Sequence, residues 1–329
     1  MKAQPPPRTV RVGVVGAGAL GYHHIRLLKK IAGADLVGFY DHNPTRAPQV
    51  ARELETTAFP SLDALLERVE AITVVVPTSA HVEVGLAVLE RGIHALIEKP
   101  LADTLPGAEQ LVQAAREHGL CLQVGHVERF NRAVRAAAPY LEEPRFLQTE
   151  RLAPFQLRGT DVAVILDLMI HDLDLVLELV RSEVGEVRAT GVPILTPHVD
   201  IANARVEFAN GAVAIITASR VSRERTRKLR IFQPTGYFSL DLAQGDGHFY
   251  RLKAGWQGLG ATQIEEIVEH VKLDAPEAEP LKLELESFLR AVRGDGDVVV
   301  TGAAGLQALT LAYRVADAIE TSPLASARP

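Results

Sequence analysis

Cysteine is nearly absent from this sequence, and long apolar runs are absent as well. Cys121 is the only cysteine among 329 residues, which excludes an intrachain disulfide and a cysteine-rich metal site. No apolar run approaches the roughly 20 residues that a membrane-spanning helix needs, and glycines interrupt the apolar run near the amino end, unlike that of a signal peptide. We therefore expect a cytoplasmic protein without a membrane segment.

The chain also lacks an excess of positive charge. The chain has 35 Lys and Arg against 41 Asp and Glu, a net charge of −6, so we expect neither nucleic acid nor a membrane surface as a partner. The hydrophobic fraction of 47% and the mean hydropathy of +0.08 are those of a globular protein. The length fits two domains of roughly 100 to 200 residues each.

Short β-branched runs alternate with helix-length stretches over residues 1–127. The runs are continuously apolar, as strands buried on both faces are; they read "VRVGVV", "DLVGFYD", "ITVVVP", "HALIEKP" and "CLQVGH". Strands of this kind separated by helices indicate a parallel sheet with helices on both sides. We predict an α/β domain over residues 1–127, a doubly wound Rossmann sheet.

The pattern changes after residue 127. A helix-like stretch over residues 161–181 precedes a series of strand-like segments, and two amphipathic helices near 280–293 and 303–320 close the chain. This order predicts an α+β domain over residues 128–329, with an open, mainly antiparallel sheet and a last helix that packs back on the first domain. An open sheet face needs a cover, so this domain is expected to form a homo-oligomer, a dimer or a tetramer. It is also the domain that we expect to bind substrate.

The first motif is Gly16-x-Gly18-x-x-Gly21, between a predicted strand and a predicted helix. The first glycine permits a tight turn, the second lets the backbone approach a pyrophosphate, and the third allows close helix packing. The amides that open the helix, at Ala19 and Leu20, would face the anion. The motif predicts a dinucleotide site; the alternative is that the glycines only form a turn.

An acidic residue follows at the distance that such a site requires. Asp41 ends the next predicted strand, 25 residues after Gly16, where a carboxylate can bond the ribose 2′-hydroxyl. The same carboxylate would repel the extra phosphate of NADP, so NAD is favoured as the cofactor. Arg46 is near enough in sequence to keep NADP as the alternative.

Two further strand ends carry candidate site residues. In "IEKPLADT", Glu98 and Lys99 lie at a carboxyl edge, where open α/β sheets bind their ligands; the alternative for Lys99 is a solvated loop lysine. In "VVVPTSAHVEVG", a strand ends at Pro77 and Thr78, and His81 lies in the following helix. These residues either form a wall of the cofactor site or have a purely structural role.

The stretch "ILDLMIHDLDL", residues 165–175, places charges in an apolar run. On a helix, Asp167, His171 and Asp174 share one face, whereas Asp172 points elsewhere. One interpretation of these residues is a metal site, but the sequence shows no further cluster of ligands for it. A second is a buried polar network, which is stable only if each of its groups is hydrogen-bonded. The third interpretation is acid–base catalysis, in which a carboxylate-oriented histidine accepts a hydroxyl proton. Because oxidation of a secondary alcohol needs a base, His171 and Lys99 are the candidates.

With these residues assembled, the chain resembles the glucose-fructose oxidoreductase, inositol dehydrogenase and MocA family. The resemblance covers essentially the whole chain and includes "GVVGAGALGYHH", "EKP", the Asp-x-x-x-His of residues 167 and 171, and "TGAAGLQALTLAYRVADAIETS". It implies a sugar oxidoreductase that uses NAD. It also implies that Lys99, Asp167 and His171 line the substrate pocket and form the catalytic set, with His171 favoured as the base. Because no further ligand cluster accompanies the His and Asp residues, we predict that no metal takes part.

Three stretches resemble a narrower group within the family, namely "VGHVERFNRAV", "LDLMIHDLDL" and "SRVSRERTRKLRIFQ". Members of that group oxidise the 3-hydroxyl of UDP-GlcNAc or a derivative, giving a 3-keto nucleotide sugar for a partner aminotransferase in lipid A or lipopolysaccharide sugar synthesis. The chain departs from the group at Arg132, where proline is usual. The alternatives are a dehydrogenase for free sugars or inositol and a non-catalytic sensor of NAD or sugar nucleotide.

A local basic stretch contrasts with the acidic whole. Residues 220–230 contain six Lys or Arg and one Glu. A solvated strand edge that discourages aggregation is one interpretation. A site for the substrate's diphosphate is the second, because guanidinium groups match phosphate geometry, and nucleic acid binding is the third. Arg129 and Arg158 flank the predicted cleft and are further candidates for substrate binding.

Overall fold

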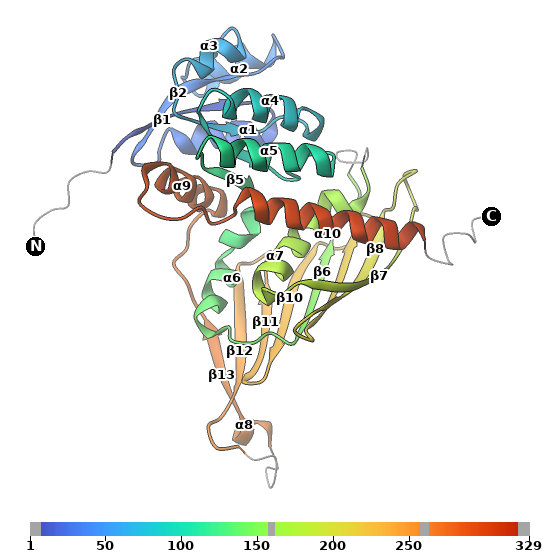
Figure 1. Ribbon diagram of the computed structural model, residues 1–329. Helices are drawn as coiled ribbons and strands as arrows, with labels where there is room; N and C mark the ends of the chain where they lie inside the picture. The colour runs from blue at the N-terminus through green and yellow to red at the C-terminus, as the bar shows by residue number, and fades with distance from the viewer. Residues whose placement is uncertain (1–7, 157–161, 257–262, 322–329) are drawn as a thin grey trace, which may run out of the picture. The chain divides into compact units, whose positions relative to one another are not determined.

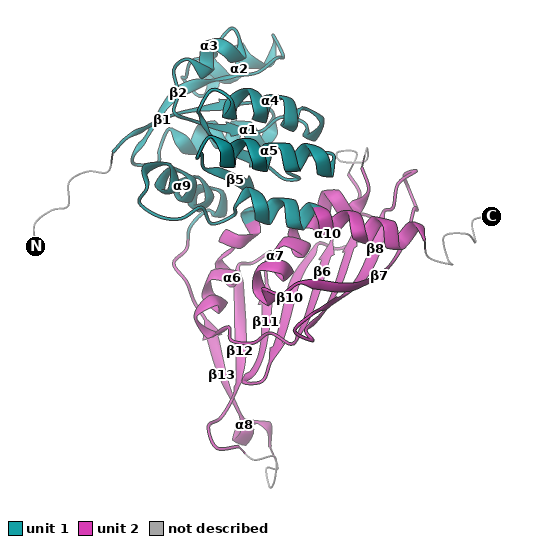
Figure 2. Cartoon of the chain, in the orientation of Figure 1, with its two compact units in different colours: residues 1–127, 278–309 teal, residues 128–277, 310–329 magenta. Residues whose placement is uncertain are grey.

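The computed structural model describes residues 8–156, 162–256 and 263–321. The chain forms two units, residues 1–127 with 278–309 and residues 128–277 with 310–329 (Figure 2). The sequence-based division has a single boundary after residue 127. Residues 278–309 group with the first unit because the apolar face of a helix in this segment completes the core of that unit.

The first unit contains a five-stranded parallel sheet with strand order β2-β1-β3-β4-β5 (Figure 1). The strands are β1 (Val10–Val15), β2 (Ala34–Tyr40), β3 (Ala71–Val74), β4 (His94–Glu98) and β5 (Leu122–Gly125). The continuous apolar runs thus form buried parallel strands, and the predicted doubly wound α/β class is confirmed. Strand order reverses at β1, and ligands of such sheets bind at the carboxyl ends beside that point.

Helices flank this sheet and pack their apolar faces on it. They are α1 (Ala19–Leu28), α2 (Arg46–Glu53), α3 (Leu62–Leu66), α4 (His81–Leu89), α5 (Leu105–Glu117) and α9 (Pro280–Arg293). Leu285, Phe288 and Leu289 of α9 lie in one buried cluster with Val12 of β1 and Leu96 of β4. The predicted helix near 280–293 is therefore confirmed as α9, and its apolar face is buried in the first unit.

The second unit contains an eight-stranded sheet with order β13-β12-β11-β10-β6-β9-β8-β7. All neighbours are antiparallel except β6 and β9, which pair in parallel. The predicted mainly antiparallel sheet is confirmed. The strands are β6 (Phe146–Leu152), β7 (Val184–Val192), β8 (Ile201–Phe208), β9 (Val213–Ser219), β10 (Thr226–Gln233), β11 (Gly236–Asp241), β12 (Asp246–Leu252) and β13 (Val268–Leu273).

Helices cover one face of that sheet. In Figure 1, α6 (Arg132–Ala137) packs on β11 and β12, and α7 (Ile170–Val180) packs on β6 and β9. The single helix predicted over residues 161–181 is shorter in the structure: residues 165–169 form a π-helix, and the α-helix begins at Ile170. The remaining helices are α8 (Ile264–Ile267) and α10 (Gly302–Glu320), with short 3-10 turns at Thr78–Ala80, Val127–Phe130 and Ala138–Tyr140.

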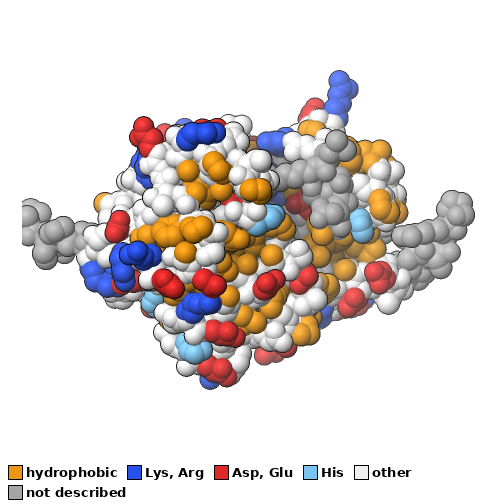
Figure 3. Space-filling model, turned by 90° about the horizontal axis from the view of Figure 1, so that it is seen from above, with side chains coloured by type: hydrophobic (Ala, Val, Ile, Leu, Met, Phe, Trp, Pro, Cys, Tyr) orange, Lys and Arg blue, Asp and Glu red, His pale blue; other side chains and the backbone are white. Residues whose placement is uncertain are grey.

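The surface mixes charges of both signs. On the face drawn in Figure 3, basic and acidic side chains lie among one another with hydrophobic side chains between them. No helix of the described residues is long and apolar enough to cross a membrane.

Candidate functional site

The glycine turn between β1 and α1 has the shape that a pyrophosphate requires. Gly16 has φ +95°, and a Cβ there would lie 2.2 Å from the carbonyl oxygen of Val75. A Cβ on Gly21 would lie 2.0 Å from the carbonyl oxygen of Gly16, so the helix packs directly on the turn. At Gly18 a Cβ would meet nothing within 4 Å. The turn therefore leaves open space where the amides that begin α1, at Ala19 and Leu20, can meet an anion.

Asp41 lies beside this turn, directly after β2. Its Oδ2 accepts a hydrogen bond from the Ala17 amide at 2.6 Å, and its Oδ1 accepts one from the Asn43 amide at 2.8 Å. Arg46 reaches the same peptide from α2, and its Nε donates to the Ala17 carbonyl at 2.9 Å. The carboxylate and the guanidinium thus bind the amide and the carbonyl of one residue, Ala17, in the glycine turn.

Residues at the end of β3 connect to the loop after β4. Pro77 and Thr78 lead into α4, where His81 is 1% exposed. Its Nδ1 lies 2.8 Å from the Pro100 carbonyl oxygen and its Nε2 lies 3.0 Å from that of Val76. Burial lowers the pKa of this imidazole. His81 therefore ties two loops at the carboxyl edge together, with both ring nitrogens turned to the backbone.

Glu98 ends β4, and its carboxylate is packed inside the unit. It is 8% exposed, and its Oε1 lies 3.2 Å from Nε2 of the fully buried His24. A Cβ on Gly125, at the end of β5, would lie 2.6 Å from Glu98 Oε2, so only glycine leaves room for this carboxylate. Lys99 follows at the sheet edge, half-buried, before a cis peptide bond to Pro100.

In the second unit, a cavity of about 150 Å³ opens beside the π-helix. Asp167 lies within that π-helix and lines the cavity, and His171 follows half-buried in the first turn of α7. π-helical turns inside helices are frequent at functional sites. The cavity is lined by Arg151, Leu152, Ala153, Pro154, Gln156, Asp167, Leu168, Arg220, Arg225 and Arg227.

Arg151, one of the lining residues, belongs to a buried ion network. Its Nε and Nη2 donate to Asp172 at 2.8 and 2.9 Å, and its Nη1 donates to Glu128 at 2.8 Å. Burial disfavours the charged guanidinium, but these two carboxylates outweigh it and raise the pKa of Arg151. Burial raises the pKa of Asp172 despite the contact with Arg151. Asp172 thus anchors α7 to β6 and is not among the residues that line the cavity.

Arg129, a predicted substrate ligand, forms ion pairs with two carboxylates of α7. Its Nε and Nη2 donate to Asp174 at 2.8 and 2.6 Å, and its Nη1 donates to Glu178. The Arg129 and Asp174 side chains are 7% and 1% exposed. Asp174 therefore fixes α7 to the Val127–Phe130 turn, and it does not line the cavity with Asp167. Arg158, the other predicted ligand, lies outside the described residues.

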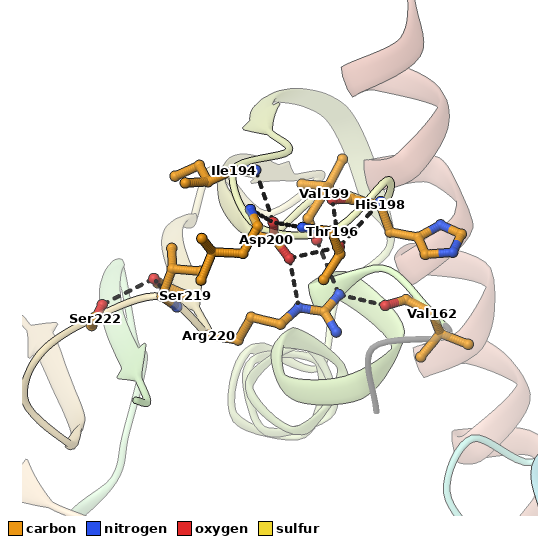
Figure 4. A network of polar contacts seen from close by, with 11 residues as sticks. Val162, Ile194, Thr196, His198, Val199, Asp200, Ser219, Arg220 and Ser222 are labelled. Carbon is orange, nitrogen blue, oxygen red and sulfur yellow. Dashed lines mark hydrogen bonds and ion pairs between the residues drawn. The ribbon is translucent and has the colours of Figure 1, made fainter. Parts of the chain in front are cut away.

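Arg220 fixes the loop that precedes the π-helix. Its Nε lies 3.2 Å from the fully buried Asp200, and its Nη2 donates to the carbonyls of Val162 and Val199 (Figure 4). Asp200 also accepts hydrogen bonds from the amides and hydroxyl of residues 194–196 at 2.6–2.9 Å. Although burial opposes it, these donors hold the pKa of Asp200 at about 2. This pair sets the backbone from which Asp167 reaches the cavity.

Sequence comparison now gives the family. Residues 10–126 match the sequence model of an oxidoreductase family with an NAD-binding Rossmann fold, and residues 135–239 match the Gfo/Idh/MocA carboxy-terminal domain. The chain belongs to the Gfo/Idh/MocA oxidoreductase family. The resemblance inferred from its motifs is confirmed, and NAD, the predicted cofactor, is the cofactor for which the first domain of the family is named.

Individual relatives of this Gfo/Idh/MocA oxidoreductase are enzymes that act on sugars and inositols. A UDP-N-acetylglucosamine 3-dehydrogenase of Acidithiobacillus ferrooxidans is 41% identical over 94% of this chain and 97% of its own length. A solved structure of that enzyme aligns with TM-score 0.88 at 40% identity, covering 95% of this chain and 98% of the other. A scyllo-inositol 2-dehydrogenase of Bacillus subtilis is 30% identical over 65% of this chain and 68% of its own.

The predicted site residues of this oxidoreductase fall in both units. The first unit brings the glycine turn, Asp41, the β3 end and the Glu98–Lys99 edge to the carboxyl side of one sheet. The second unit holds Asp167 and His171. Among the described residues, no group of three His, Cys, Asp or Glu is arranged to hold a metal ion.

The structure adds functional candidates that the sequence motifs do not single out. Arg151 and Arg220 line the cavity while paired to carboxylates, and Arg225 and Arg227 line it from the basic stretch. The clustering of basic residues over 220–230 is visible in sequence. Which of these basic residues face the cavity depends on the alternation of side chains along the strand and on acidic partners that are distant in sequence. No sequence motif indicates either.

Proposed function

We propose that this oxidoreductase uses NAD to oxidise the 3-hydroxyl of UDP-GlcNAc, or of a close derivative, to a 3-keto nucleotide sugar. The observation that carries the proposal is the 41% identity over 94% of the chain to a UDP-N-acetylglucosamine 3-dehydrogenase. The cavity of the second unit supports it, because a carboxylate and several guanidinium groups line one small space. A sugar hydroxyl and a diphosphate need that combination.

The glycine turn fits the proposed cofactor. The open space at Gly18 and the amides of Ala19 and Leu20 suit a pyrophosphate, and Asp41 suits an adenosine ribose. Pro77, Thr78, His81 and Glu98 are proposed to surround the cofactor from the neighbouring strand ends. When bound there, NAD would supply the acceptor for the hydrogen of the carbinol carbon and its electron pair.

The chain's own residues are proposed to handle the proton. As the carbon loses its hydrogen with the bonding pair, the hydroxyl must lose its proton so that the oxygen lone pair can complete the carbonyl. Neutral His171 accepts that proton, and Asp167 orients the imidazole and stabilises its charged form. Lys99 binds the substrate hydroxyl and is the second candidate for the base. Because the carboxylates of Asp174 and Glu178 occupy Arg129, we leave it out of the substrate contacts.

Partners follow from the product and from the second-unit sheet. A 3-keto sugar is a substrate for amination, so we propose that an aminotransferase consumes it, in the cytoplasm where the nucleotide sugar is available. We also propose a homo-oligomer formed through the open face of the eight-stranded sheet. An aromatic row supports this, because Phe146, Phe232, Tyr237, Tyr250 and His270 lie in register across five strands.

A substrate panel tests the proposed activity. Purified protein is mixed with NAD and, in separate reactions, UDP-GlcNAc, its uronic acid, glucose and myo-inositol, and NADH formation is followed by absorbance. We expect reduction with a UDP-linked sugar and none with the free polyols. Reduction by free polyols alone would replace the proposal with the inositol-dehydrogenase alternative, which the 30% identical relative represents. Tight NAD binding without turnover of any compound would favour a sensor.

Variants of one histidine test the assigned chemistry. His171→Ala should reduce kcat by about 100-fold or more, since general bases contribute roughly 10²–10⁴-fold, while NAD binding measured by fluorescence stays within twofold, roughly. His198→Ala, an exposed histidine of the same unit, is the matched control. Full turnover by His171→Ala would transfer the role of base to Lys99. A chelator should leave the wild-type rate unchanged.

A further inference from the structure

The arginines of the second-unit cavity are of two kinds. Arg151 and Arg220 are each 4% exposed, and each pairs with a buried carboxylate, Asp172 or Asp200. Arg225 is exposed, and the Arg227 side chain is 41% exposed. The first two therefore belong to the framework of the cavity, whereas the second two can be reached by a ligand from solvent.

The two accessible arginines are incompletely neutralised. Arg227 lies directly opposite Arg151 in the β10–β6 register, a like-charge pairing that is unfavourable by itself. Glu128 lies between them, but its Oε1 is 2.8 Å from Arg151 and 3.6 Å from Arg227. No ion pair of Arg225 is found within the described part of the chain. Partial burial and the charge of Arg151 together lower the pKa of Arg227, as expected for a cation short of a counterion.

Strand geometry separates these residues from their basic neighbours. On β10, Arg227 shares the helix-covered face with the buried Leu229 and Ile231, whereas Lys228 and Arg230 are exposed on the other face. Because side chains alternate along the strand, Arg227 lies on the same face as the cavity, whereas Lys228 and Arg230 lie on the open face of the sheet.

We propose that Arg225 and Arg227 bind the diphosphate of the nucleotide sugar, and that this pair makes the enzyme select nucleotide sugars over free sugars. The inference rests on the proposed function, since it takes Asp167 to mark the reacting end of the substrate. Two guanidinium groups present several parallel N–H donors, which match the oxygens of a phosphate group.

The dimensions of the cavity agree with this assignment. Its volume of about 150 Å³ is below the roughly 300–1,000 Å³ of pockets that enclose whole ligands, so it accepts one part of a larger molecule. In a hexose linked to a diphosphate through C1, the reacting C3 is only two ring bonds from the linkage. A single small cavity can therefore hold both groups, with Asp167 near the 3-hydroxyl and Arg225 and Arg227 near the diphosphate.

The test measures UDP binding and sugar turnover in the same full-length variants. Arg225→Gln and Arg227→Gln should each raise the Kd for UDP, measured by calorimetry, by about 10- to 100-fold, the usual loss for one hydrogen bond to a charged group. The KM for UDP-GlcNAc should rise in parallel, with kcat changed by less than about threefold. Arg230→Gln removes the same charge from the other face of β10 and should change neither value. Arg227→Lys, which keeps the charge, should recover part of the UDP affinity.

The outcomes separate this inference from the proposed function. If wild-type protein oxidises UDP-GlcNAc while both glutamine variants bind UDP with unchanged Kd, the diphosphate assignment is overturned and the activity stands. If wild-type protein does not oxidise UDP-GlcNAc, but the two variants bind UDP more weakly than the wild type, the anion site stands and the proposed activity is overturned. A variant effect on glucuronate inhibition without one on UDP would assign the pair to a sugar carboxylate and overturn the diphosphate role.

Discussion

The three aspartates of "ILDLMIHDLDL" have three different environments, although they lie within eight residues. Asp167 lines the cavity, Asp172 bonds the buried Arg151, and Asp174 bonds the buried Arg129. Buried carboxylates of this kind are costly unless paired, and removing either partner leaves a buried charge. Two of the three acids therefore hold α7 in place, whereas the third, Asp167, lines the cavity.

Asp41 carries a prediction about cofactor choice. Asp41→Asn keeps an oxygen that can accept the Ala17 amide, now 2.6 Å away, but it removes the charge that would repel the phosphate of NADP. We expect the ratio of kcat/KM for NAD over that for NADP to fall by about tenfold or more, the order of one hydrogen bond to a charged group. Steady-state kinetics with both cofactors measures the ratio.

Asp35→Asn is the control for this change, because Asp35 is exposed at the start of the same strand. A ratio that does not move in Asp41→Asn would show that the carboxylate has no part in cofactor choice. Arg46 would then be the residue to change next, since its Nε reaches the same turn.

At the scale of elements, the loop over residues 193–199 depends on one carboxylate. Asp200 is fully buried, and its pKa of about 2 is below the ordinary 3.8. Because the folded-state pKa is depressed, its contribution to stability is complete above about pH 4 and is lost as the pH falls toward 2. The difference of nearly two pKa units corresponds to about 2 kcal/mol.

Asp200→Asn should therefore lower the free energy of unfolding by about 2 kcal/mol or more near pH 7, because it also leaves the buried Arg220 without its carboxylate. The gap between variant and wild type should narrow between pH 4 and pH 2, where the wild-type carboxylate becomes protonated. Urea unfolding followed by circular dichroism at several pH values measures this. Asp63→Asn, in an exposed pair with Arg91, should change stability little. A gap that stays constant across this pH range would contradict the assignment.

The sequence predicts elements well where burial is uniform. Strands β1 and β3 are apolar on both faces, so their runs are easily recognised, and α9 follows a clear amphipathic pattern. Strand β6 is missed because its inward row includes Arg151, whose partners Asp172 and Glu128 lie 21 and 23 residues away in sequence. A charge neutralised at that distance looks like a surface residue in the sequence alone.

The candidate site shows the same division. Local spacing predicts the glycine turn and the position of Asp41, because each depends on one turn or one strand end. The π-helix at Ile165–Met169 lies between Asp167 and α7, so the α-helical spacing from Asp167 to His171 and Asp174 does not give their relative directions, and Asp174 bonds Arg129. The separation of Arg225 and Arg227 from Lys228 and Arg230 requires the strand register, which the sequence does not supply.

For the whole molecule, the open face of the second-unit sheet is the surface through which we propose that copies of the chain assemble. Phe232, Tyr237, Tyr250 and His270 stack across neighbouring strands with ring centres 4.7–5.3 Å apart. Phe232 is 37% exposed. A stacked aromatic row on a partly exposed sheet face is the kind of surface that proteins cover. We propose that a second copy of the chain covers it with the same row across a twofold axis.

Tyr237→Arg places a charge in the middle of this row and should therefore disrupt the oligomer. We expect sedimentation or light scattering to give a multiple of 35.7 kDa for the wild type and a value near 35.7 kDa for the variant. Tyr140→Arg is the matched control, since Tyr140 is also 37% exposed but contacts the buried Phe249 on the helix-covered face. A monomeric wild type, or an oligomer that both variants leave intact, would exclude this face as the interface, because a buried unpaired arginine is strongly unfavourable.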